Sequence, residues 1–544
     1  MIRARWLGRL AYEEAWDLQR AIWEGRVEGR ADSDYLLLLE HPDTYTVGRN
    51  GDGSNVLDGT AIAESGAAVV HVDRGGDVTY HGPGQLVGYP IVEVPRLPNG
   101  FDMVGHVRRL EQGLIDALAP LGVEAWAEPG FTGVWTRLGK VAAIGVRVSR
   151  GVSMHGFALN VDPDMAMWDH INPCGIEDRP VTSLQQLLDR PVTLEEAVSA
   201  VIPAVTAALG ATEVDTQLAA FARGAGDRFD IDQRVAAGVF SAEARDFTPI
   251  LIDGRLPGEP SRPEWMKVTA HTDTSGYREL KELMRGLDLN TVCEEAKCPN
   301  IYECWTQGTA TMMLLGEVCT RACGFCDVTT GRPGEVDVDE PARAAEAIEK
   351  LGLHHAVLTS VNRDDLADGG SLIFAETIRQ IRDRVPGCEV EVLVPDFKGD
   401  RTALETVMEA RPAVLNHNTE TVLRLQRDVR TAANYGRSLA LLARARWLDP
   451  TATVKSGLIV GMGETEDEVV GALADLCAVG VDIVTIGQYL RPTPRHRPID
   501  RYVHPDEFDR YARAGESLGL AHVESGPLVR SSYHARDSLA AARV

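Results

Sequence analysis

No stretch of this chain is apolar for long enough to cross a lipid bilayer, since a spanning helix needs roughly 20 consecutive apolar residues. The N-terminal segment MIRARWLGRLAYEEAWDLQRAIWEG lacks the apolar core of a secretory signal peptide and carries acidic residues early. Basic residues are also in short supply, because 55 Lys and Arg stand against 80 Asp and Glu, a net charge of −25. This balance argues against a general nucleic-acid binder. We therefore expect a cytoplasmic protein that has neither a membrane nor a nucleic acid as a partner.

Cysteine is scarce outside one short region. Of the 9 cysteines, Cys174, Cys388 and Cys477 stand alone, and the others form two triplets with the spacings C-x4-C-x5-C and C-x3-C-x2-C. The triplets are Cys293, Cys298 and Cys304, then Cys319, Cys323 and Cys326. Disulfides are not expected without a secretory signal. A structural zinc site needs four closed ligands, whereas a cubane iron–sulfur cluster on three thiolates keeps one iron open for chemistry. We therefore predict two such clusters, with zinc as the alternative because soft thiolates also suit zinc.

The bulk composition is that of a globular protein, with 44% hydrophobic and 25% charged residues, and 544 residues are enough for two or three domains. The first 210 residues or so mix strands, glycine turns and helices without regular alternation, which favours an α+β domain. Apolar periodicity predicts helices near 16–23, 103–118 and 194–209, and YLLLLE at 35–40 predicts a buried strand.

A polar segment rich in glycine and proline follows and ends in GRLPGEPSRP. Its apolar periodicity is weak apart from a short stretch at 232–239, which predicts one short helix. We therefore divide the chain into a first domain at 1–213, a linker at 214–263 and a second domain at 264–544.

From about residue 310 onward, apolar strand candidates alternate with helical stretches such as 341–351, 371–384 and 465–479. The strand candidates lie at 312–315, 356–359, 390–394, 413–415, 454–460, 483–486 and 521–523. Such alternation predicts parallel strands with crossover helices, and six or seven units indicate an α/β partial or full barrel. Barrel enzymes carry their chemistry at the C-terminal ends of the strands. The segment CTRACGFC directly follows the first strand candidate, so it lies where an active site is expected.

This cysteine segment, with Cys319, Cys323 and Cys326, resembles the C-x3-C-x2-C signature of radical S-adenosylmethionine enzymes. The resemblance implies a [4Fe–4S] cluster whose open iron chelates S-adenosylmethionine and whose electron cleaves it to a 5′-deoxyadenosyl radical. GLIVGMGET at 457–465 is similar to the glycine-rich strand end and acid of that family. The alternative for this stretch is an ordinary strand–turn–helix with Thr465 as N-cap and Glu468 at the third helical position.

Further motifs narrow the family. VCEEAKCPNIYECW, TSVNRDDLADGG, HNTETV, GQYLRPT and GPLVRSSYHA occur in this order and together resemble lipoyl synthase from about residue 265 to the end. The resemblance implies an auxiliary [4Fe–4S] cluster on Cys293, Cys298 and Cys304, with Ser532 of the R-S-S-Y motif as fourth ligand and Ser531 as the fallback. It also implies insertion of two sulfurs at C6 and C8 of a protein-bound octanoyl chain.

A basic strip, RPTPRHR at 491–497, stands out on the acidic chain and follows a strand candidate. It is either a solvated loop or a contact for an acidic carrier domain.

In the first half, the stretches RGGDVTYHGPGQ at 74–85, GKVAAIGVRVSRGVSMHGFALNV at 139–161 and INPCGI at 171–176 single out Lys140 and Cys174. Cysteine suits acyl transfer from a thioester, because the acyl-cysteine stays reactive toward an amine. A nearby ammonium can lower the pKa of such a thiol. Taken alone, a single cysteine is more often a buried small hydrophobe, and a single lysine is usually a surface residue.

These stretches resemble octanoyl-carrier-protein:protein octanoyltransferase, the lipoate–protein ligase B family, over roughly residues 1–212. The resemblance implies a biotin/lipoate-ligase-like fold, Cys174 as nucleophile and acyl carrier, and Lys140 as general acid/base. It also implies that three segments line the acyl site. They comprise Arg74, Gly75, Gly76, Asp77, Val78, Thr79, Tyr80 and His81, then Ala143, Ile144 and Gly145, and finally Gly156, Phe157 and Ala158.

Together the two resemblances imply a bifunctional enzyme that attaches octanoate to a lipoyl domain and then converts it to the lipoyl group. The implied cofactors are two [4Fe–4S] clusters and S-adenosylmethionine. The implied partners are octanoyl-acyl carrier protein, the lipoyl domains of 2-oxoacid dehydrogenases and glycine cleavage H protein, and an electron donor such as ferredoxin or flavodoxin. Three alternatives stay open: a cluster-binding redox or scaffold protein, radical sulfur insertion into another substrate, and a first half that activates lipoate or octanoate with ATP.

Overall fold

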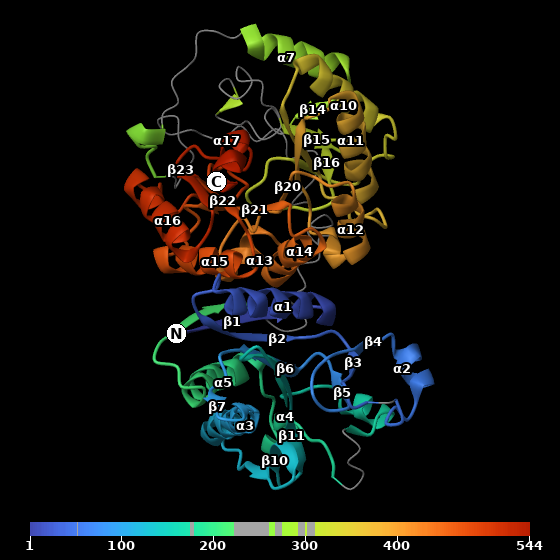
Figure 1. The fold of residues 1–544 in the computed structure, drawn as a ribbon, viewed down its shortest axis with the longest axis vertical. Helices are drawn as coiled ribbons and strands as arrows, with labels where there is room; N and C mark the ends of the chain where they lie inside the picture. Colours follow the sequence, from blue (N-terminus) through green and yellow to red (C-terminus); the bar gives the residue numbers. More distant parts are fainter. Residues whose placement is uncertain are drawn as a thin grey trace. The chain divides into compact units, whose positions relative to one another are not determined.

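The computed structural model describes residues 1–51, 53–173, 179–221, 260–266, 275–291, 300–301 and 311–543. Its internal contacts divide the chain into two compact units, Met1–Phe221 and Ala222–Val544, and each is described by itself (Figure 1). Among the described residues, no helix combines the length and the apolar character needed to cross a membrane.

The first unit is built around an eight-stranded mixed sheet with the strand order β13-β1-β2-β6-β12-β11-β10-β9. Its strands are β1 (Ile2–Arg9), β2 (Asp34–Glu40), β6 (Gln85–Ile91), β9 (Trp126–Glu128), β10 (Phe131–Thr136), β11 (Gly139–Ser149), β12 (Val152–Asn160) and β13 (Val214–Leu218). β1 runs parallel to β2 and β13, and the remaining neighbours are antiparallel. This mixed pairing confirms the predicted α+β class.

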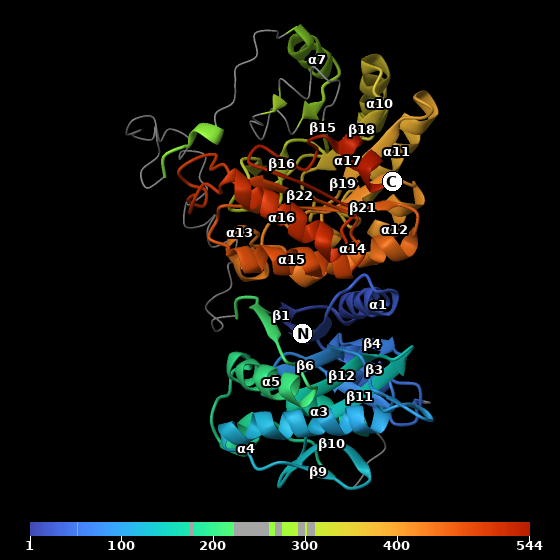
Figure 2. The same cartoon turned by 60° about the vertical axis from the view of Figure 1, so that its left-hand side comes forward.

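Helices cover both faces of this sheet (Figure 2). α1 (Tyr12–Glu28) packs on β6 and β12, whereas α3 (Met103–Leu118) and α5 (Leu194–Ala208) pack against each other on the opposite face. Leu110, Leu114 and Val201 of α3 and α5 join sheet residues such as Leu38 and Phe157 in the main core. The helices predicted near 16–23, 103–118 and 194–209 are therefore confirmed, because their apolar stripes are the faces that pack.

A smaller sheet, β4-β3-β5, lies beside the large one, with β3 at Thr44–Val47, β4 at Ala68–His71 and β5 at Val78–His81. Its aromatic core contains Tyr45, Tyr80 and Trp168. The remaining short elements of the unit are α2 (Gly59–Ser65), β7 (Arg96–Leu97), β8 (Gly100–Phe101), η1 (Ala119–Leu121), η2 (Met165–His170) and α4 (Leu184–Leu188).

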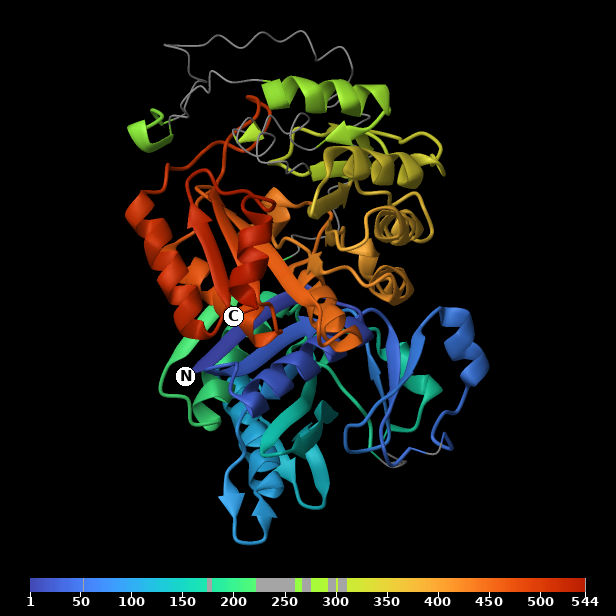
Figure 3. The same ribbon diagram turned by 45° about the horizontal axis from the view of Figure 1, so that its top comes forward.

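The second unit, drawn from yellow-green to red in Figure 3, contains the other large sheet. This sheet has eight strands in the order β14-β15-β18-β19-β20-β21-β22-β23. The strands are β14 (Asn290–Thr291), β15 (Thr311–Leu314), β18 (His355–Ser360), β19 (Glu389–Leu393), β20 (Val414–Asn416), β21 (Thr453–Val460), β22 (Ile483–Gln488) and β23 (His522–Gly526). β14 is antiparallel to β15, and all later neighbours are parallel. This confirms the predicted α/β partial barrel.

Crossover helices join these parallel strands. They are α10 (Glu340–Leu351), α11 (Ser371–Arg384), α12 (Arg401–Glu409), α14 (Tyr435–Leu448), α15 (Glu466–Ala478) and α16 (Pro505–Leu518). Shorter or peripheral elements are η5 (Glu264–Met266), α7 (Ser275–Gly286), β16 (Val318–Cys319), β17 (Thr329–Thr330), η6 (Phe397–Gly399), η7 (Leu423–Leu425), α13 (Gln426–Val429) and α17 (Ala535–Ala542). Buried residues of the early strands and of α10–α12, such as Leu358, Ile348 and Phe374, form one core.

The start of α15 shows how local sequence sets an element. The Thr465 hydroxyl accepts the Glu468 amide at 3.2 Å, and the Glu468 carboxylate accepts the Thr465 amide at 2.9 Å. This capping box satisfies two amides that have no partner inside the helix, and losing such a cap costs about 1 kcal/mol. Thr465 is the N-cap and Glu468 the third helical residue, which is the local structure that the alternative for this stretch describes.

The range 214–263, predicted as a linker, begins with strand β13. β13 pairs with β1 from Ile2↔Val214 to Trp6↔Leu218, so these residues extend the first sheet. The short sequence VDTQL alternates only weakly, and its pairing depends on a strand more than 200 residues earlier. Residues 222–259, with the helix predicted at 232–239, lie outside the described residues. The three domain boundaries themselves stay a prediction.

Candidate functional site

The segments predicted to line the acyl site of the first unit meet where the small sheet adjoins the large one. The Gly75 amide donates to the Val146 carbonyl at 3.2 Å, and Gly145 lies opposite Gly156 in the β11–β12 pair. A Cβ on Gly145 would lie 3.0 Å from the Gly75 carbonyl oxygen, and one on Gly156 would lie 2.1 Å from the Gly88 carbonyl oxygen. Glycine is thus required at these positions because backbones approach each other closely.

Arg74 is buried and its guanidinium shapes this region. Its Nη2 donates to the carbonyl and the hydroxyl of Thr46, both at 2.8 Å, and its Nη1 donates to the Gly75 carbonyl at 3.1 Å. At the other end of the predicted segment, His81 bonds Gln85 at 2.8 Å through Nδ1. Burial, helped by the charges of His41 and Arg74, lowers the pKa of His81 well below its ordinary value. His81 is therefore neutral near pH 7, and Arg74 supplies the positive charge.

Lys140 lies near the start of β11 and is buried. Its amide donates to the Pro180 carbonyl at 2.9 Å, and its carbonyl accepts the Thr182 amide at 3.0 Å. Cys174 itself lies outside the described residues, which stop at 173 and resume at 179. On the entry side, the Asn172 amide donates to the Asn55 carbonyl at 2.8 Å. The chain is therefore held by backbone hydrogen bonds both before and after the predicted nucleophile. After it, the partner is the backbone of Lys140.

Trp135 was not anticipated from the sequence. The Lys140 ammonium lies 4.8 Å from the centroid of the Trp135 ring, and the Arg179 guanidinium carbon lies 5.3 Å from it. Arg179 also lies 4.5 Å from the Phe131 ring and pairs with Glu128 at 3.0 Å. One aromatic surface thus contacts both the predicted acid/base and the first described residue after Cys174. The aromatic residues of FTGVW at 131–135, just before Lys140, are the signal that could have identified it.

His155, directly before Gly156, is a second residue that the sequence did not reveal. Its backbone is left-handed, with φ of +58°, and its Nε2 bonds Asp73 at 2.7 Å. Its ring packs near Trp16 and Tyr89, and Nδ1 has no hydrogen-bond partner among the described residues. Burial lowers the pKa of His155 although Asp73 opposes the shift. A buried, strained histidine next to the predicted acyl segments indicates that the surrounding packing, not local preference, fixes its position.

In the second unit, the cysteine loop (residues 318–328, between β15 and α10) lies at the C-terminal ends of the strands, where it was predicted. The Thr320 hydroxyl donates to the Asn362 carbonyl at 3.0 Å, and the Gly324 amide donates to the Val429 carbonyl at 2.9 Å. Asn362 follows β18 and Val429 is the last residue of α13, so this loop is fastened to one strand end and to one helix end. The first triplet, Cys293, Cys298 and Cys304, lies outside the described residues.

The thiols of the cysteine loop fit a cluster of the predicted kind. Burial raises the pKa of Cys323 to about 11 and that of Cys326 to about 12, with contributions from the neighbouring cysteines. Cys319 Sγ accepts the amides of Arg321 at 3.4 Å and Asn362 at 3.3 Å, and hydrogen bonds to the sulfurs are one of the features that tune such clusters. The described residues contain no three His, Cys, Asp or Glu side chains grouped around one ion. A cubane cluster does not require this, since its three cysteines bind three different irons.

Near the cysteine loop, Asn418 links two further motifs. Its Nδ2 donates to the Glu420 carboxylate at 3.0 Å and to the Ser531 hydroxyl at 2.6 Å. Burial raises the pKa of Glu420, and the Glu420 charge in turn raises the pKa values of Cys323 and Cys326. The C-terminal R-S-S-Y motif therefore lies beside HNTETV, close to the cysteine loop, and Ser532 is half-buried there.

The glycine-rich strand end is held by its own acid. The Glu464 carboxylate accepts the amides of Gly461 and Met462, the latter at 3.0 Å, while burial raises its pKa. Gly461 has φ of +101°, a conformation that favours glycine. Glu464 thus stabilises the turn between β21 and α15.

The basic strip 491–497 is not a free loop. Arg491 donates to the His496 carbonyl at 3.0 Å, and Arg497 donates to the Met462 carbonyl at 3.0 Å. His496 Nε2 bonds the Cys326 carbonyl at 2.8 Å, and the Arg497 amide donates to the Gly324 carbonyl at 2.9 Å. Arg495 is the exposed arginine of the strip. His496 and Arg497, at the end of the strip, therefore support the cysteine loop.

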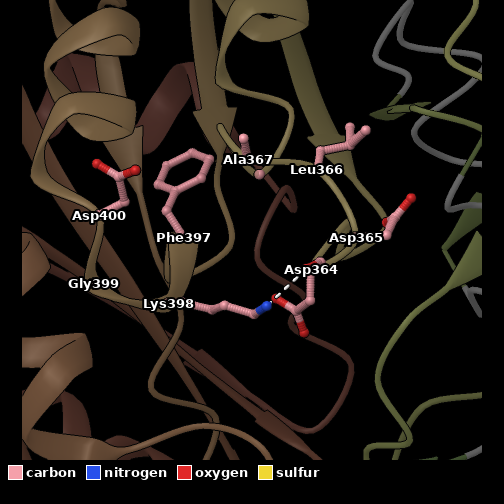
Figure 4. Close-up of a pocket in the computed structure, with 9 residues that line it drawn as sticks. Asp364, Asp365, Leu366, Ala367, Phe397, Lys398, Gly399 and Asp400 are labelled. Carbon is pink, nitrogen blue, oxygen red and sulfur yellow. Dashed lines mark hydrogen bonds between the residues drawn. The ribbon is translucent and has the colours of Figure 1, made fainter. Parts of the chain in front are cut away.

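A cavity of about 600 Å³ opens beside this site, between the loops that follow β18 and β19 (Figure 4). Asp364, Asp365, Phe397, Lys398 and Asp400 line it. Lys398 Nζ donates to the Asp364 carbonyl at 2.7 Å across the cavity floor. The cavity is therefore polar and lies on the same strand ends as the cysteine loop.

Comparison with known proteins identifies two families in the chain. The lipoyl protein ligase A/B catalytic domain matches residues 11–206, and the radical SAM superfamily matches residues 313–476. Lipoyl synthase of Rubrobacter xylanophilus is 60% identical over 286 residues, which cover 53% of this chain and 89% of the relative. Lipoyl synthase of Symbiobacterium thermophilum is 55% identical over 295 residues, which cover 53% of this chain and 92% of the relative.

Two solved structures are also similar. Lipoate–protein ligase A bound with ATP aligns at 17% identity and a TM-score of 0.35 over 41% of this chain and 89% of that one. Methylornithine synthase aligns at 13% identity and a TM-score of 0.28 over 41% of this chain and 62% of that one. The first unit carries the lipoyl protein ligase A/B catalytic domain. Because the lipoyl synthases match over nearly their whole length, the chain belongs to the lipoyl synthase family, whose members are radical S-adenosylmethionine sulfurtransferases of lipoate biosynthesis.

Proposed function

We propose that this chain catalyses two consecutive steps. The first unit transfers octanoyl from octanoyl-acyl carrier protein to a lysine of a lipoyl domain, and the second inserts sulfur at C6 and C8 of that chain. The observation that carries the proposal is the presence of both family matches in one chain, because the product of the first reaction is the substrate of the second.

In the first step, the Cys174 thiolate attacks the thioester carbonyl, and the carrier thiol leaves with a proton from the Lys140 ammonium. The acceptor amine then attacks the acyl-cysteine, gives its proton to Lys140 and releases the thiolate. The backbone bonds between Lys140 and residues 180–182 support this pairing, because they bring the exit of the Cys174 segment to the lysine. The close-packed glycines 75, 145 and 156 let backbone line the acyl chain.

In the second step, we assign Cys319, Cys323 and Cys326 to the cluster that binds S-adenosylmethionine. We assign Cys293, Cys298, Cys304 and Ser532 to an auxiliary cluster. When bound, these groups supply one-electron cleavage of the sulfonium and the sulfur to be inserted. The chain's own contribution is to hold the cysteine loop against the end of β18 and the end of α13, and to place the R-S-S-Y motif near it.

The proposal implies three partners: an octanoylated acyl carrier protein, a lipoyl domain such as that of a 2-oxoacid dehydrogenase or glycine cleavage H protein, and a ferredoxin- or flavodoxin-type electron donor. The alternative for the first unit is ATP-dependent ligation, because the matching family includes both A and B types.

The test is to incubate anaerobically reconstituted protein with octanoyl carrier protein, a lipoyl domain, S-adenosylmethionine and a reductant. The mass of the lipoyl domain should first rise by one octanoyl group and then by two sulfurs. A parallel reaction with free octanoate and ATP but no carrier protein should leave the domain unmodified. Octanoylation only in that parallel reaction would establish the ligase alternative and disprove the transferase.

A further inference from the structure

Arg321 is a buried cation between the first two cysteines of the cysteine loop, with 5% of its surface exposed. Its Nε and Nη2 donate to the two oxygens of Asp364 at 2.7 and 2.8 Å. Nη2 also donates to Asp396 Oδ1 at 2.6 Å. A guanidinium suits such a site because its planar fork satisfies two carboxylates at once.

The two carboxylates come from different strand ends. Asp364 belongs to the loop after β18, and Asp396 to the loop after β19. These two loops are also joined to each other, because Lys398 Nζ donates to the Asp364 carbonyl at 2.7 Å (Figure 4). Within the β19 loop, the Lys398 amide donates to Asp396 Oδ1 at 3.1 Å. Arg321 therefore connects the cysteine loop to a pair of loops that already hold each other in place.

The β19 loop is itself fixed. Phe397 and Lys398 have φ of +46° and +54°, two adjacent non-glycine residues in the left-handed region. Such a backbone persists only where surrounding contacts over-determine it. Asp396, the residue before them, is fully buried. It is therefore a rigid anchor for Arg321.

The opposite side of the cysteine loop is held separately. His496 bonds the Cys326 carbonyl, and the Arg497 amide bonds the Gly324 carbonyl, as described above. The Arg321 amide, moreover, donates directly to Cys319 Sγ at 3.4 Å. The cysteines thus lie between attachments on two sides, and on the side of Cys319 and Cys323 Arg321 adds buried ion pairs to the hydrogen bonds with Asn362.

We propose that Arg321 is a positioning residue for the radical step, which sets the location of Cys319 and Cys323 relative to the strand ends through its ion pairs with Asp364 and Asp396. The inference rests on the proposed cluster at Cys319, Cys323 and Cys326, and it is independent of the first unit. Replacing Arg321 should therefore change the surroundings of the cluster even in a protein that still folds.

Arg321→Met is the test variant, and Arg363→Met is its matched control. Arg363 has an equally buried side chain and pairs with Asp365 at 2.9 Å in the same β18 loop. Its hydrogen bonds among the described residues go to Asp365 and Gly334 and not to the cysteine loop. The full-length holoproteins are compared by iron content, by the EPR spectrum of the reduced cluster with and without S-adenosylmethionine, and by kcat and KM for cofactor cleavage.

We expect Arg321→Met to shift or broaden the EPR signal, to speed iron loss to a chelator, and to lower kcat at least tenfold. Arg321→Lys should recover part of each effect, because one ion pair can re-form. Arg363→Met should keep the wild-type spectrum. An Arg321→Met protein with wild-type spectrum and kcat, or one that only matches Arg363→Met, overturns the inference.

If Arg321→Met does not fold, as judged by circular dichroism, Asp396→Asn and Arg321→Lys decide, because both keep the shape of the site while weakening the ion pair. Wild-type spectra and kcat in both of these variants overturn the inference. A separate measurement tests the cluster assignment on which the inference rests. If Cys319, Cys323 and Cys326 hold no cluster, replacing all three with Ala will leave the iron content of the protein unchanged.

Discussion

Asn418 and Ser531 are joined by a hydrogen bond of 2.6 Å, from the amide Nδ2 to the hydroxyl oxygen. Asn418 lies just after β20 and Ser531 in the C-terminal R-S-S-Y motif, so the bond ties the end of the chain to the strand ends near the cysteine loop. The same amide also holds Glu420. Of the two adjacent serines, Ser531 thus bonds Asn418, and Ser532 is the one proposed as the cluster ligand.

The two serines should therefore respond differently to replacement. Ser532→Ala should make the auxiliary cluster labile, so that iron is lost faster to a chelator and sulfur insertion stops while cofactor cleavage continues. Ser531→Ala should keep both clusters and slow insertion only partly, because it removes the bond to Asn418 rather than a ligand. Iron per chain and the mass of the lipoyl domain report both effects. If Ser531→Ala instead loses iron faster and stops sulfur insertion, the cluster ligand is Ser531.

Replacing Cys174 should abolish acylation of the first unit. After mixing with octanoyl carrier protein, intact mass should show one octanoyl adduct on the wild-type chain and none on Cys174→Ala. Cys388→Ala, which removes a half-buried thiol of the second unit, is the matched control and should keep the adduct. Lys140→Met should slow transfer by about 10²–10⁴-fold, the usual contribution of a general acid/base. An adduct that persists on Cys174→Ala would assign the nucleophile elsewhere.

Trp135 should matter to transfer through its contact with Lys140 and Arg179. A buried cation–π contact contributes about 0.5–2 kcal/mol, so Trp135→Leu should lower kcat by about 2- to 30-fold with a smaller change in KM. Trp135→Phe should be milder. Trp447→Leu, at an exposed position of α14 in the second unit, should leave kcat of the transfer unchanged.

Lys455 and Glu391 form a buried ion pair inside the barrel, with an N–O distance of 3.0 Å and 1% of each side chain exposed. Lys455→Met should destabilise the second unit by up to about 3–5 kcal/mol, because it leaves the buried Glu391 carboxylate without its lysine, with only His355 and Asn416 beside it. Lys455→Met/Glu391→Leu should recover part of that loss. Glu466→Gln, which breaks an exposed pair with Arg510, should cost less than about 1 kcal/mol. Chemical unfolding followed by circular dichroism measures these differences.

The same pair predicts a pH dependence. Burial alone would raise the pKa of Glu391, but Lys455 and His355 outweigh it, so the pKa is lowered in the fold. The stabilisation is therefore complete above the unfolded glutamate pKa of about 4.3 and is lost as pH falls through the lowered folded value. Below pH 4 the wild-type advantage over the double variant should shrink. An advantage that grows on acidification would contradict the assigned sign.

Truncation tests whether β13 belongs to the first unit. A fragment of residues 1–221 keeps β13 and should be folded and active in octanoyl transfer. A fragment that ends at residue 213 lacks the strand that pairs with β1 over Val214–Leu218, and it exposes the edge of β1. We expect it to melt at lower temperature and to aggregate more readily. Equal melting temperatures for the two fragments would show that β13 contributes nothing to stability.

Much of the fold was encoded locally. The apolar runs at 312–315 and 454–460 became β15 and β21, and the Thr465/Glu468 box begins α15, because periodicity and capping depend on residues within one or two turns. The position of CTRACGFC at the active-site edge was also predictable from the sequence, because parallel strands bring their carboxyl ends to one edge. The candidate cysteines and lysine were found by spacing and resemblance, which require no coordinates.

What the sequence did not determine depends on residues that are far apart in the chain. β13 is a strand only because β1 offers it an edge, and the basic strip supports the cysteine loop because His496 reaches Cys326. Arg321 has its ion pairs with Asp364 and Asp396, and Lys140 lies on a Trp135 ring that it shares with Arg179. Periodicity shows which face of an element is buried but not what lies opposite it. The partners of buried charges were therefore decided by tertiary packing, because only the folded chain brings distant strand ends within hydrogen-bond distance.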